Sequence, residues 1–245
     1  MHSSRSAAFS LALAILVAAA CSRGPSFEER RAEGIAAFQE GRFDKAIITL
    51  DALSLENPRD FETRYYLARS LESDQRLPAA LREWDDVLRL RPSLVEGHYR
   101  RGNVLAIMKD TQGAIDAWNR ALEIDPTFHK AYFNLANAYE EMEMWDEAVR
   151  HYLLTIEADS SFVPGYLNLA LLLQRAEQWD FALDMFDRAI ELDPDYAPPY
   201  MNRINILAAT GRGEEATARV DELLAMENLD STLADSLRAL RGRIE

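Results

Sequence analysis

Apolar residues recur along most of the chain with the spacing of amphipathic helices. In residues 129–162, one stripe consists of Tyr132, Leu135, Ala136 and Tyr139. After a short polar stretch, a second stripe consists of Trp145, Ala148, Val149, Tyr152 and Ile156. Steps of three and four residues place such side chains on one face of a helix. The pattern therefore predicts two helices joined by a polar turn, and no stretch of the sequence alternates as a strand would.

The same pattern returns every 34 residues. Each second stripe carries an alanine, at Ala46, Ala80, Ala114, Ala148, Ala182 and Ala216. A bulky apolar residue follows four positions later, at Leu50, Trp84, Trp118, Tyr152, Phe186 and Val220. A small residue recurs in the first stripe, at Gly34, Ala68, Gly102, Ala136 and Ala170, and Ile204 breaks this series. Small residues allow two helices to approach closely, so each period is expected to be one helix pair.

Six such units tile the chain, at residues 27–60, 61–94, 95–128, 129–162, 163–196 and 197–230. Prolines stand near the ends of four units, at Pro58, Pro92, Pro126 and Pro194. Proline cannot continue a helix, and it disfavours helical geometry in the residue before it. The second helix of a unit is therefore expected to end before its proline.

The segment AYFNLANAYEEMEMWDEAVRHYLLTIEAD, residues 131–159, resembles the tetratricopeptide repeat (TPR) family from end to end. The resemblance extends over residues 27–230. It implies an all-α fold, a right-handed α-solenoid of six 34-residue helix-turn-helix repeats. The last unit departs from the family pattern, because Arg203 and Ile204 replace the usual leucine and small residue, and Asn228 replaces the proline.

Residues 231–245 are predicted to be a C-terminal capping helix. Its apolar positions lie on one face, at Leu233, Leu237, Leu240 and Ile244. The exposed end of a solenoid needs such a cover, because the last repeat has no neighbour to bury its apolar face. The alternative is a helix on which a partner docks.

The first 20 residues have the features of an export signal. Arg5 is the single charge, and the run from residue 7 to residue 20 is apolar except for Ser10. Fourteen helical residues span about 21 Å, which is short of the roughly 30 Å hydrocarbon core of a bilayer. A basic start followed by a short apolar run is typical of a signal peptide. No second apolar run of membrane-spanning length follows in the sequence.

Cys21 lies directly after this run, in the segment LVAAAC. The segment resembles the bacterial lipobox, although the best lipoboxes carry leucine where Ala18 stands. The resemblance implies that residues 1–20 are cleaved off, that Cys21 is acylated and that residues 21–26 tether the chain to a membrane. Because Ser22 rather than aspartate follows, an outer-membrane, periplasm-facing location is favoured. The alternative is a soluble secreted or periplasmic protein with a free terminal thiol.

Composition narrows the function. The 245 residues include 27 Lys and Arg against 41 Asp and Glu, a formal net charge of −14. Removal of residues 1–20 deletes one base and no acid, which makes the charge −15. An acidic chain is poorly suited to nucleic acid, whose binding needs a basic surface. The single cysteine excludes a disulfide framework.

No enzymatic motif is present, so the sequence predicts a non-enzymatic protein without cofactor, metal site or small-molecule substrate. The four histidines do not have the spacing of a metal site. His98 occupies the position held by Tyr132, Tyr166 and Tyr200 in other units, so it is expected to act as a structural aromatic side chain.

In the TPR family the first helix of each repeat lines a concave groove. The resemblance therefore implies a peptide-binding groove formed by Tyr65, Arg69, Tyr99, Asn103, Phe133, Asn134, Asn137, Asn168, Asn202 and Asn205. Asparagine amides can pair with an extended peptide backbone. The alternative is structural, because asparagine at these positions belongs to the family consensus. A carboxylate clamp is not expected, because Tyr65, Tyr99 and Phe133 stand where its lysines would be.

These observations predict a lipid-anchored scaffold that binds peptide segments or helices of other envelope proteins. By resemblance, such lipoproteins serve pilus or secretion assembly or outer-membrane assembly. The membrane is expected to be contacted only through the acyl chains. The alternative is a structural or oligomerising spacer protein of the envelope, whose contacts are made through its edges.

Overall fold

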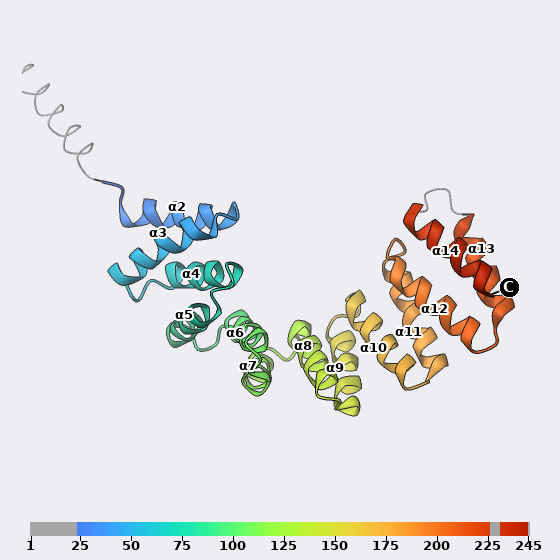
Figure 1. Ribbon diagram of the computed structural model, residues 1–245. Helices are drawn as coiled ribbons and strands as arrows, with labels where there is room; N and C mark the ends of the chain where they lie inside the picture. The colour runs from blue at the N-terminus through green and yellow to red at the C-terminus, as the bar shows by residue number, and fades with distance from the viewer. Residues whose placement is uncertain (1–23, 226–230, 245) are drawn as a thin grey trace, which may run out of the picture. The chain divides into compact units, whose positions relative to one another are not determined.

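The computed structural model describes residues 24–225 and 231–244, with the side chains of residues 232 and 233 excluded. All regular secondary structure in this part of the chain is helical (Figure 1). The thirteen described helices are α2 (Phe27–Gln39), α3 (Phe43–Glu56), α4 (Phe61–Ser73), α5 (Leu77–Leu90), α6 (Val95–Ile107), α7 (Thr111–Ile124), α8 (His129–Glu141), α9 (Trp145–Ala158), α10 (Val163–Arg175), α11 (Trp179–Leu192), α12 (Ala197–Ala209), α13 (Gly213–Leu224) and α14 (Ser231–Ile244). The predicted all-α solenoid class is confirmed.

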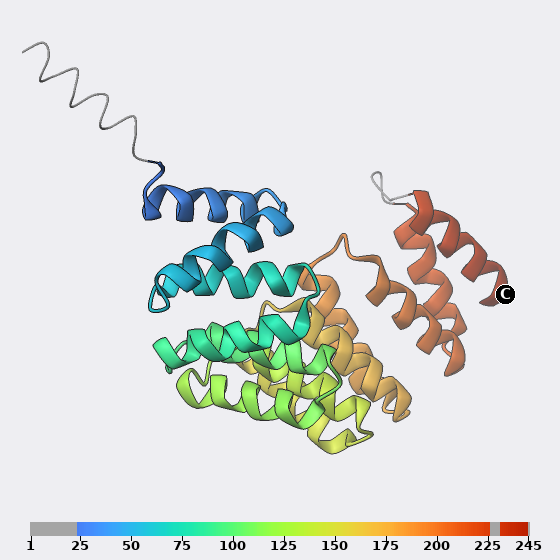
Figure 2. The same cartoon turned by 60° about the vertical axis from the view of Figure 1, so that its left-hand side comes forward.

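The helices alternate between two kinds, which we call first helices and second helices. Helices of each kind begin at 34-residue intervals. First helices have 13 residues and begin at Phe27, Phe61, Val95, His129, Val163 and Ala197. Second helices begin at Phe43, Leu77, Thr111, Trp145, Trp179 and Gly213. From α2 to α6 and from α8 to α14, adjacent helices pack against each other, as α2 does on α3 and α3 does on α4 (Figure 2).

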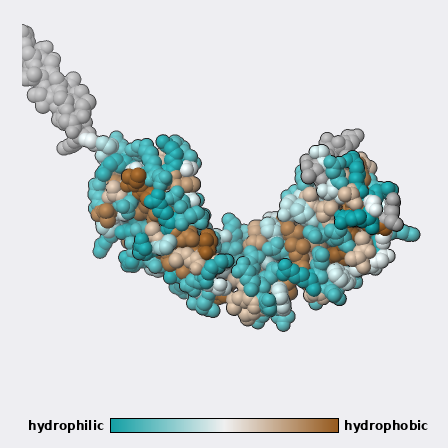
Figure 3. Space-filling view, in the orientation of Figure 1, coloured by the Kyte–Doolittle hydropathy of each residue, from teal (hydrophilic) through white to brown (hydrophobic). Residues whose placement is uncertain are grey.

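The chain divides into two compact units between Ala117 and Trp118, inside α7. Unit 1 contains α2 to α6, and unit 2 contains α8 to α14. In both units the face seen in Figure 3 is mainly hydrophilic and is interrupted by hydrophobic patches.

The core consists of the residues that define the period. The six alanines of the second helices are all 0% exposed. Of the bulky residues four positions later, five are 0% exposed and Trp118 is 4% exposed. Ile204, which breaks the series of small residues, is also fully buried and belongs to the core of unit 2. The apolar stripes therefore face the interior, as the sequence predicts.

The turn inside each helix pair contains one residue with left-handed backbone geometry. These residues are again 34 apart, at Gly41, Gln75, Lys109, Glu143, Glu177 and Gly211, with φ between 56° and 79°. The next residue donates its backbone N–H to the carbonyl five positions earlier, as from Arg42 to Ala37 at 2.8 Å. This bond ends the first helix and reverses the chain. Glycine occupies only two of the six positions, so the sequence alone did not reveal the feature.

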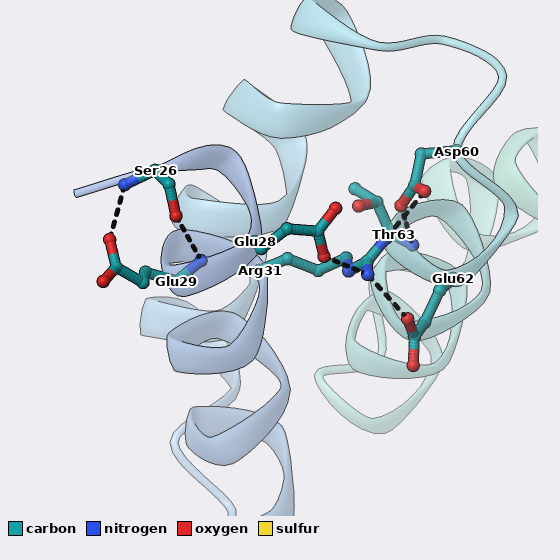
Figure 4. Close-up of polar contacts among 7 residues, drawn as sticks. All are labelled: Ser26, Glu28, Glu29, Arg31, Asp60, Glu62 and Thr63. Atoms are coloured by element: carbon teal, nitrogen blue, oxygen red, sulfur yellow. Dashed lines mark hydrogen bonds and ion pairs between the residues drawn. The ribbon is translucent and has the colours of Figure 1, made fainter.

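The first described helix begins with a capping box (Figure 4). The Ser26 hydroxyl accepts a hydrogen bond from the Glu29 backbone N–H at 3.2 Å, and the Glu29 carboxylate accepts one from the Ser26 N–H at 2.7 Å. Such reciprocal bonds satisfy N–H groups that the first turn leaves unpaired. Ser26, the last residue of the predicted tether, is thus the N-cap of α2.

Arg31 joins α2 to the start of α4 (Figure 4). It pairs with Asp60 at 2.7 Å and Glu62 at 3.2 Å, and it also pairs with Glu28. Asp60 in turn accepts a hydrogen bond from the backbone N–H of Thr63 at 2.9 Å and so caps α4. Hydrogen bonds and ion pairs thus connect α2 with α4.

At the other end of the described chain, α14 packs on α13 and α12. Leu237 and Leu240 are buried, and Arg241 pairs with Asp221 of α13 at 2.7 Å. Leu233, which the sequence places on the same face, lies outside the described side chains. The predicted signal peptide and Cys21 also lie outside the described residues. Within residues 24–225 and 231–244, no helix combines the length and apolar composition that crossing a membrane requires.

Replacement of Gly34 by alanine tests the close packing of α2 on α3. A Cβ atom at Gly34 would lie 2.8 Å from both Cγ and Cδ2 of Leu50, which is fully buried. We expect Gly34→Ala to lower the free energy of unfolding by about 1–2 kcal/mol, since overpacking outweighs the gain in helix propensity.

Gly242→Ala in α14 is the matched control, because its Cβ would meet nothing within 4 Å. It is expected to stabilise the chain by up to about 1 kcal/mol. Urea unfolding followed by circular dichroism measures both changes. Equal effects of the two substitutions would contradict the packing argument.

Candidate functional site

Successive first helices lie side by side within each unit and form a surface that we call the first-helix face. In unit 1, α2 contacts α4, and Glu72 of α4 pairs with Arg100 of α6. In unit 2, Asn168 of α10 donates a hydrogen bond to Asn137 of α8. All ten predicted groove residues belong to first helices, four in unit 1 and six in unit 2.

In unit 1, a half-buried carboxylate organises this face. Trp84 donates its indole N–H to Glu72 Oε2 at 3.2 Å, and Arg100 pairs with Glu72 Oε1 at 3.3 Å. Arg100 also pairs with Glu96 at 2.5 Å. Burial raises the pKa of Glu72 above its usual value, although Arg100 and the Trp84 bond act in the opposite direction. The ring of Tyr65 packs edge-on against Trp84 at 5.6 Å.

Arg69, a predicted groove residue, is held by aromatic rings. Its guanidinium lies 4.7 Å from the ring centre of Phe38 and 5.7 Å from that of Tyr65. Such cation–π contacts are stabilising, and more so when water is excluded. The predicted residues Tyr99 and Asn103 follow on α6, where both are half-buried.

In unit 2, a tyrosine takes the role of Trp84. The Tyr152 hydroxyl lies 2.6 Å from Asn137 Oδ1 and 2.8 Å from Glu140 Oε2, and it can donate to either. Asn168 donates its amide to Asn137 Oδ1 at 3.1 Å, and Arg175 pairs with Glu140 at 2.7 Å. Burial and the Glu140 carboxylate raise the pKa of Tyr152, so its hydroxyl stays protonated and donates at neutral pH.

The two units thus repeat one arrangement. Trp84 and Tyr152 occupy equivalent positions two periods apart, and so do Glu72 and Glu140. In both units the aromatic side chain of a second helix donates to the glutamate of its first helix, which pairs with an arginine of the next first helix. The site residues predicted from the sequence do not include Glu72, Glu140 or Arg175. The signal in the sequence that could have identified the two glutamates is their shared position in the 34-residue period.

The structure does not treat the three equivalent asparagines alike. Asn168 joins the bonded network, whereas Asn202 donates to the carbonyl of Pro198 in its own helix at 3.0 Å. Asn134 is half-buried, and Asn205 is exposed. Phe133 packs against the rings of Tyr152 and Phe162, at centroid distances of 6.0 and 5.2 Å. The structure therefore brings the predicted amides of Asn137 and Asn168 together.

The bonded network of unit 2 opens onto a polar cleft. Asn137, Glu140, Glu141 and Arg175 line this cleft, which has a volume of about 430 Å³. Its amide, carboxylate and guanidinium groups can donate and accept hydrogen bonds with a peptide. In the part of the chain that the structure describes, no three His, Cys, Asp or Glu side chains are grouped so as to hold a metal ion.

His98 takes the structural role expected of it. Its Nε2 lies 2.9 Å from the carbonyl oxygen of Pro92, six residues earlier. Tyr200 makes the equivalent bond to the carbonyl of Pro194 at 3.1 Å, and Tyr166 to that of Ser160 at 3.2 Å. The histidine thus preserves a contact between the start of a first helix and the loop before it.

Comparison with protein families agrees with these helix pairs. Four TPR family models match the chain, at residues 31–95, 102–143, 131–161 and 173–240. The chain is therefore a tetratricopeptide-repeat protein. Proteins of this class are typically non-enzymatic scaffolds for protein–protein interaction. No curated protein sequence matches the chain.

Several solved structures share the fold. The chain aligns to pilF of Pseudomonas aeruginosa with a TM-score of 0.66 and 15% identity, over 87% of this chain and 96% of that one. The alignment to MamA from Desulfovibrio magneticus RS-1 has a TM-score of 0.63 and 22% identity, and it covers 70% of this chain and 97% of that one. The alignment to YrrB, a TPR protein described as having an unusual peptide-binding site, has a TM-score of 0.58 and 22% identity, and it covers 78% of this chain and 97% of that one. At these identities the likeness concerns the fold.

The raised pKa of Glu72 predicts a pH-dependent stability. As the pH rises above the usual carboxyl pKa of 4.5, Glu72 ionises in the unfolded chain before it ionises in the folded chain, where it is half-buried. The free energy of unfolding therefore falls between pH 4.5 and the higher native pKa. Glu72→Gln removes this term, so the variant should gain stability relative to the wild type between pH 4 and pH 7.

Urea unfolding at several pH values tests this expectation. Glu83, whose pKa is also raised by burial, is present in both proteins, so its contribution cancels in the difference. A difference between variant and wild type that is constant with pH would contradict the assignment to Glu72.

Proposed function

We propose that this protein is a scaffold of the bacterial cell envelope that binds a peptide segment or helix of another protein along the first-helix face of unit 2. The observation that carries the proposal is the polar cleft, whose walls are bonded to one another before any partner arrives. One wall is held by the hydrogen bonds among Asn137, Asn168 and Tyr152. Another wall is formed by the ion pair of Glu140 and Arg175.

The physical advantage of this cleft is preorganisation. Binding normally immobilises side chains, at a cost of about 0.5–1.5 kcal/mol for each flexible one. Here Glu140 is largely buried and is held by a hydrogen bond from Tyr152. The Arg175 side chain is paired with Glu140 but is 64% exposed. The remaining donors of Arg175 and the amide groups can therefore bond a peptide with little further ordering.

The fold likeness to YrrB supports binding of a peptide rather than a small molecule, because that protein is described as having a peptide-binding site. The cleft walls are groups suited to main-chain amides, and main-chain pairing is insensitive to the sequence of the guest.

Lipid anchoring at Cys21 completes the proposal. A diacylated cysteine holds a protein stably at a membrane, since each buried CH₂ contributes about 0.8 kcal/mol. Confinement to that surface raises the effective concentration of partners there. The proposed partners are envelope proteins engaged in pilus or secretion assembly or in outer-membrane assembly, and the proposed location is the periplasmic side of the outer membrane.

Loss of the two bonded amides tests the polar cleft. We expect Asn137→Ala with Asn168→Ala to weaken the binding of envelope partners about thirtyfold, because two hydrogen bonds of about 1 kcal/mol each are lost. Pull-down from envelope extract with the full chain as bait, quantified by mass spectrometry, measures this change.

Asn119→Ala is the matched control, because Asn119 is an exposed asparagine of the second helix α7. It should leave partner recovery unchanged. Thermal unfolding shows whether each variant keeps its fold. If the double variant remains folded and recovers the same partners, the polar cleft is not the binding site.

Substitution of Cys21 tests the anchor independently. In cells supplied with labelled palmitate, the wild type should incorporate the label, and Cys21→Ala should not. Ser22→Ala is the control for a change at the adjacent position. Label on Cys21→Ala, or on neither protein, would refute lipidation at Cys21.

A further inference from the structure

A second cleft lies in unit 2, between the start of α9 and the end of α10. Its volume is about 530 Å³, and we call it the turn-edge cleft. Apolar groups line most of it, at Trp145, Val149, Leu172, Leu173 and Ala176. Asp146, Arg175 and Gln178 supply the polar lining. An apolar pocket of this size with a few polar groups matches the usual character of a binding site.

Three large apolar side chains are exposed in the turn beside this cleft. Met142 is 45% exposed, Met144 is 36% exposed and Trp145 is 44% exposed. All three lie within four consecutive positions, between the end of α8 and the first residue of α9. Clustered exposed apolar residues mark interaction sites, and tryptophan is enriched among the residues that dominate binding energy.

The same turn carries a strong negative charge. Residues 140–147, EEMEMWDE, contain five carboxylates and no lysine or arginine. Arg175, the base in the lining of the turn-edge cleft, is paired with Glu140. Glu143 and Asp146 are both exposed. A partner surface of positive charge would therefore be favoured, and like charge would be excluded.

The fold itself does not require these residues. At the equivalent turn of unit 1, Leu77 takes the place of Trp145 and Gln75 takes the place of Glu143. Gln75 and Glu143 nevertheless share the same left-handed geometry, with φ of 59° at each. The turn thus forms without the glutamate and the tryptophan, although Glu177 and Trp179 repeat this pair one period later.

We propose that the turn-edge cleft binds a basic segment of a partner protein in which lysine or arginine alternates with apolar residues. Trp145 anchors an apolar side chain of that segment in the cleft. Glu143 and Asp146 attract its flanking bases. The residues that carry this proposal differ from the amides of the polar cleft, so either proposal can fail alone.

A labelled peptide, Lys-Leu-Lys-Phe-Lys-Leu-Lys, serves as the probe. Fluorescence anisotropy with the full-length chain should show saturable binding that weakens as salt is added, because surface charges are screened. A peptide with glutamate in place of lysine should not bind. A peptide with serine in place of leucine and phenylalanine should not bind either.

Trp145→Ala should weaken probe binding at least about tenfold, as loss of a central aromatic anchor does. Glu143→Lys should weaken it about three- to tenfold at low salt by reversing a local charge. The latter substitution is structurally mild, because Lys109 holds the same left-handed position one period earlier.

Two control variants lie on α9 outside the cleft lining. Leu153→Ala removes another exposed apolar residue, which is 48% exposed, and Glu157→Lys reverses another exposed charge. Both should bind the probe like the wild type. Circular dichroism establishes that every variant is folded.

Several outcomes would overturn the proposal. The proposal fails if the wild type does not bind the probe, or if Trp145→Ala binds it as well as the wild type does. It also fails if Glu143→Lys and Glu157→Lys weaken binding equally, because that result would indicate attraction by overall charge. Loss of probe binding in the Asn137→Ala, Asn168→Ala double variant with retention in Trp145→Ala would place the peptide in the polar cleft instead. Loss in Trp145→Ala with retention in that double variant supports the turn-edge cleft, whatever the envelope pull-down shows.

Discussion

In each helix pair, the second helix contains one completely buried alanine. This burial is the constraint on which the turns and the polar contacts of the structure depend. Each of these alanines is 0% exposed, and the bulky residue one turn later is buried beside it. Interiors are close-packed, so a larger side chain at the alanine position would have to push the helices apart. The short turn with its left-handed residue then connects two helices already held at close range. Where the small residue of the first helix is absent, Ile204 is accommodated within the core of unit 2.

This packing also positions the polar groups of the first-helix face. Trp84 and Tyr152 stand one helical turn after their alanines, so the ring fills the core while its polar atom reaches the neighbouring helix. The glutamate that accepts this bond is held where an arginine of the following first helix can pair with it. A buried polar group is costly unless it is bonded, so each glutamate depends on these partners. Core packing and the chemistry of the surface are thus linked through one side chain per unit.

The two clefts of unit 2 differ in character, and each suits a different part of a bound protein. The polar cleft offers bonded amide, carboxylate and guanidinium groups, which suit a peptide main chain. The turn-edge cleft offers an exposed tryptophan among carboxylates, which suits a basic and apolar segment. Arg175 lines both clefts and pairs with Glu140. We propose that main-chain bonding in the polar cleft holds many partners and that the charge and apolar pattern at the turn selects among them.

The sequence by itself determined the helices, their 34-residue period, the buried residues and the TPR class, because helix amphipathicity and small-residue positions are local and repeated. It also indicated the first helices as the candidate face and His98 as structural. It did not reveal the left-handed turn positions, since glycine fills only two of six. It also did not reveal that Asn168 and Asn202, which share a position in the 34-residue period, have different hydrogen-bond partners. Only the tertiary structure decided that Asn137 meets Asn168, that Glu140 meets Arg175, and that Trp145 borders a cleft with Leu172. These contacts join residues on different helices, and their geometry depends on how the helices pack rather than on the period alone.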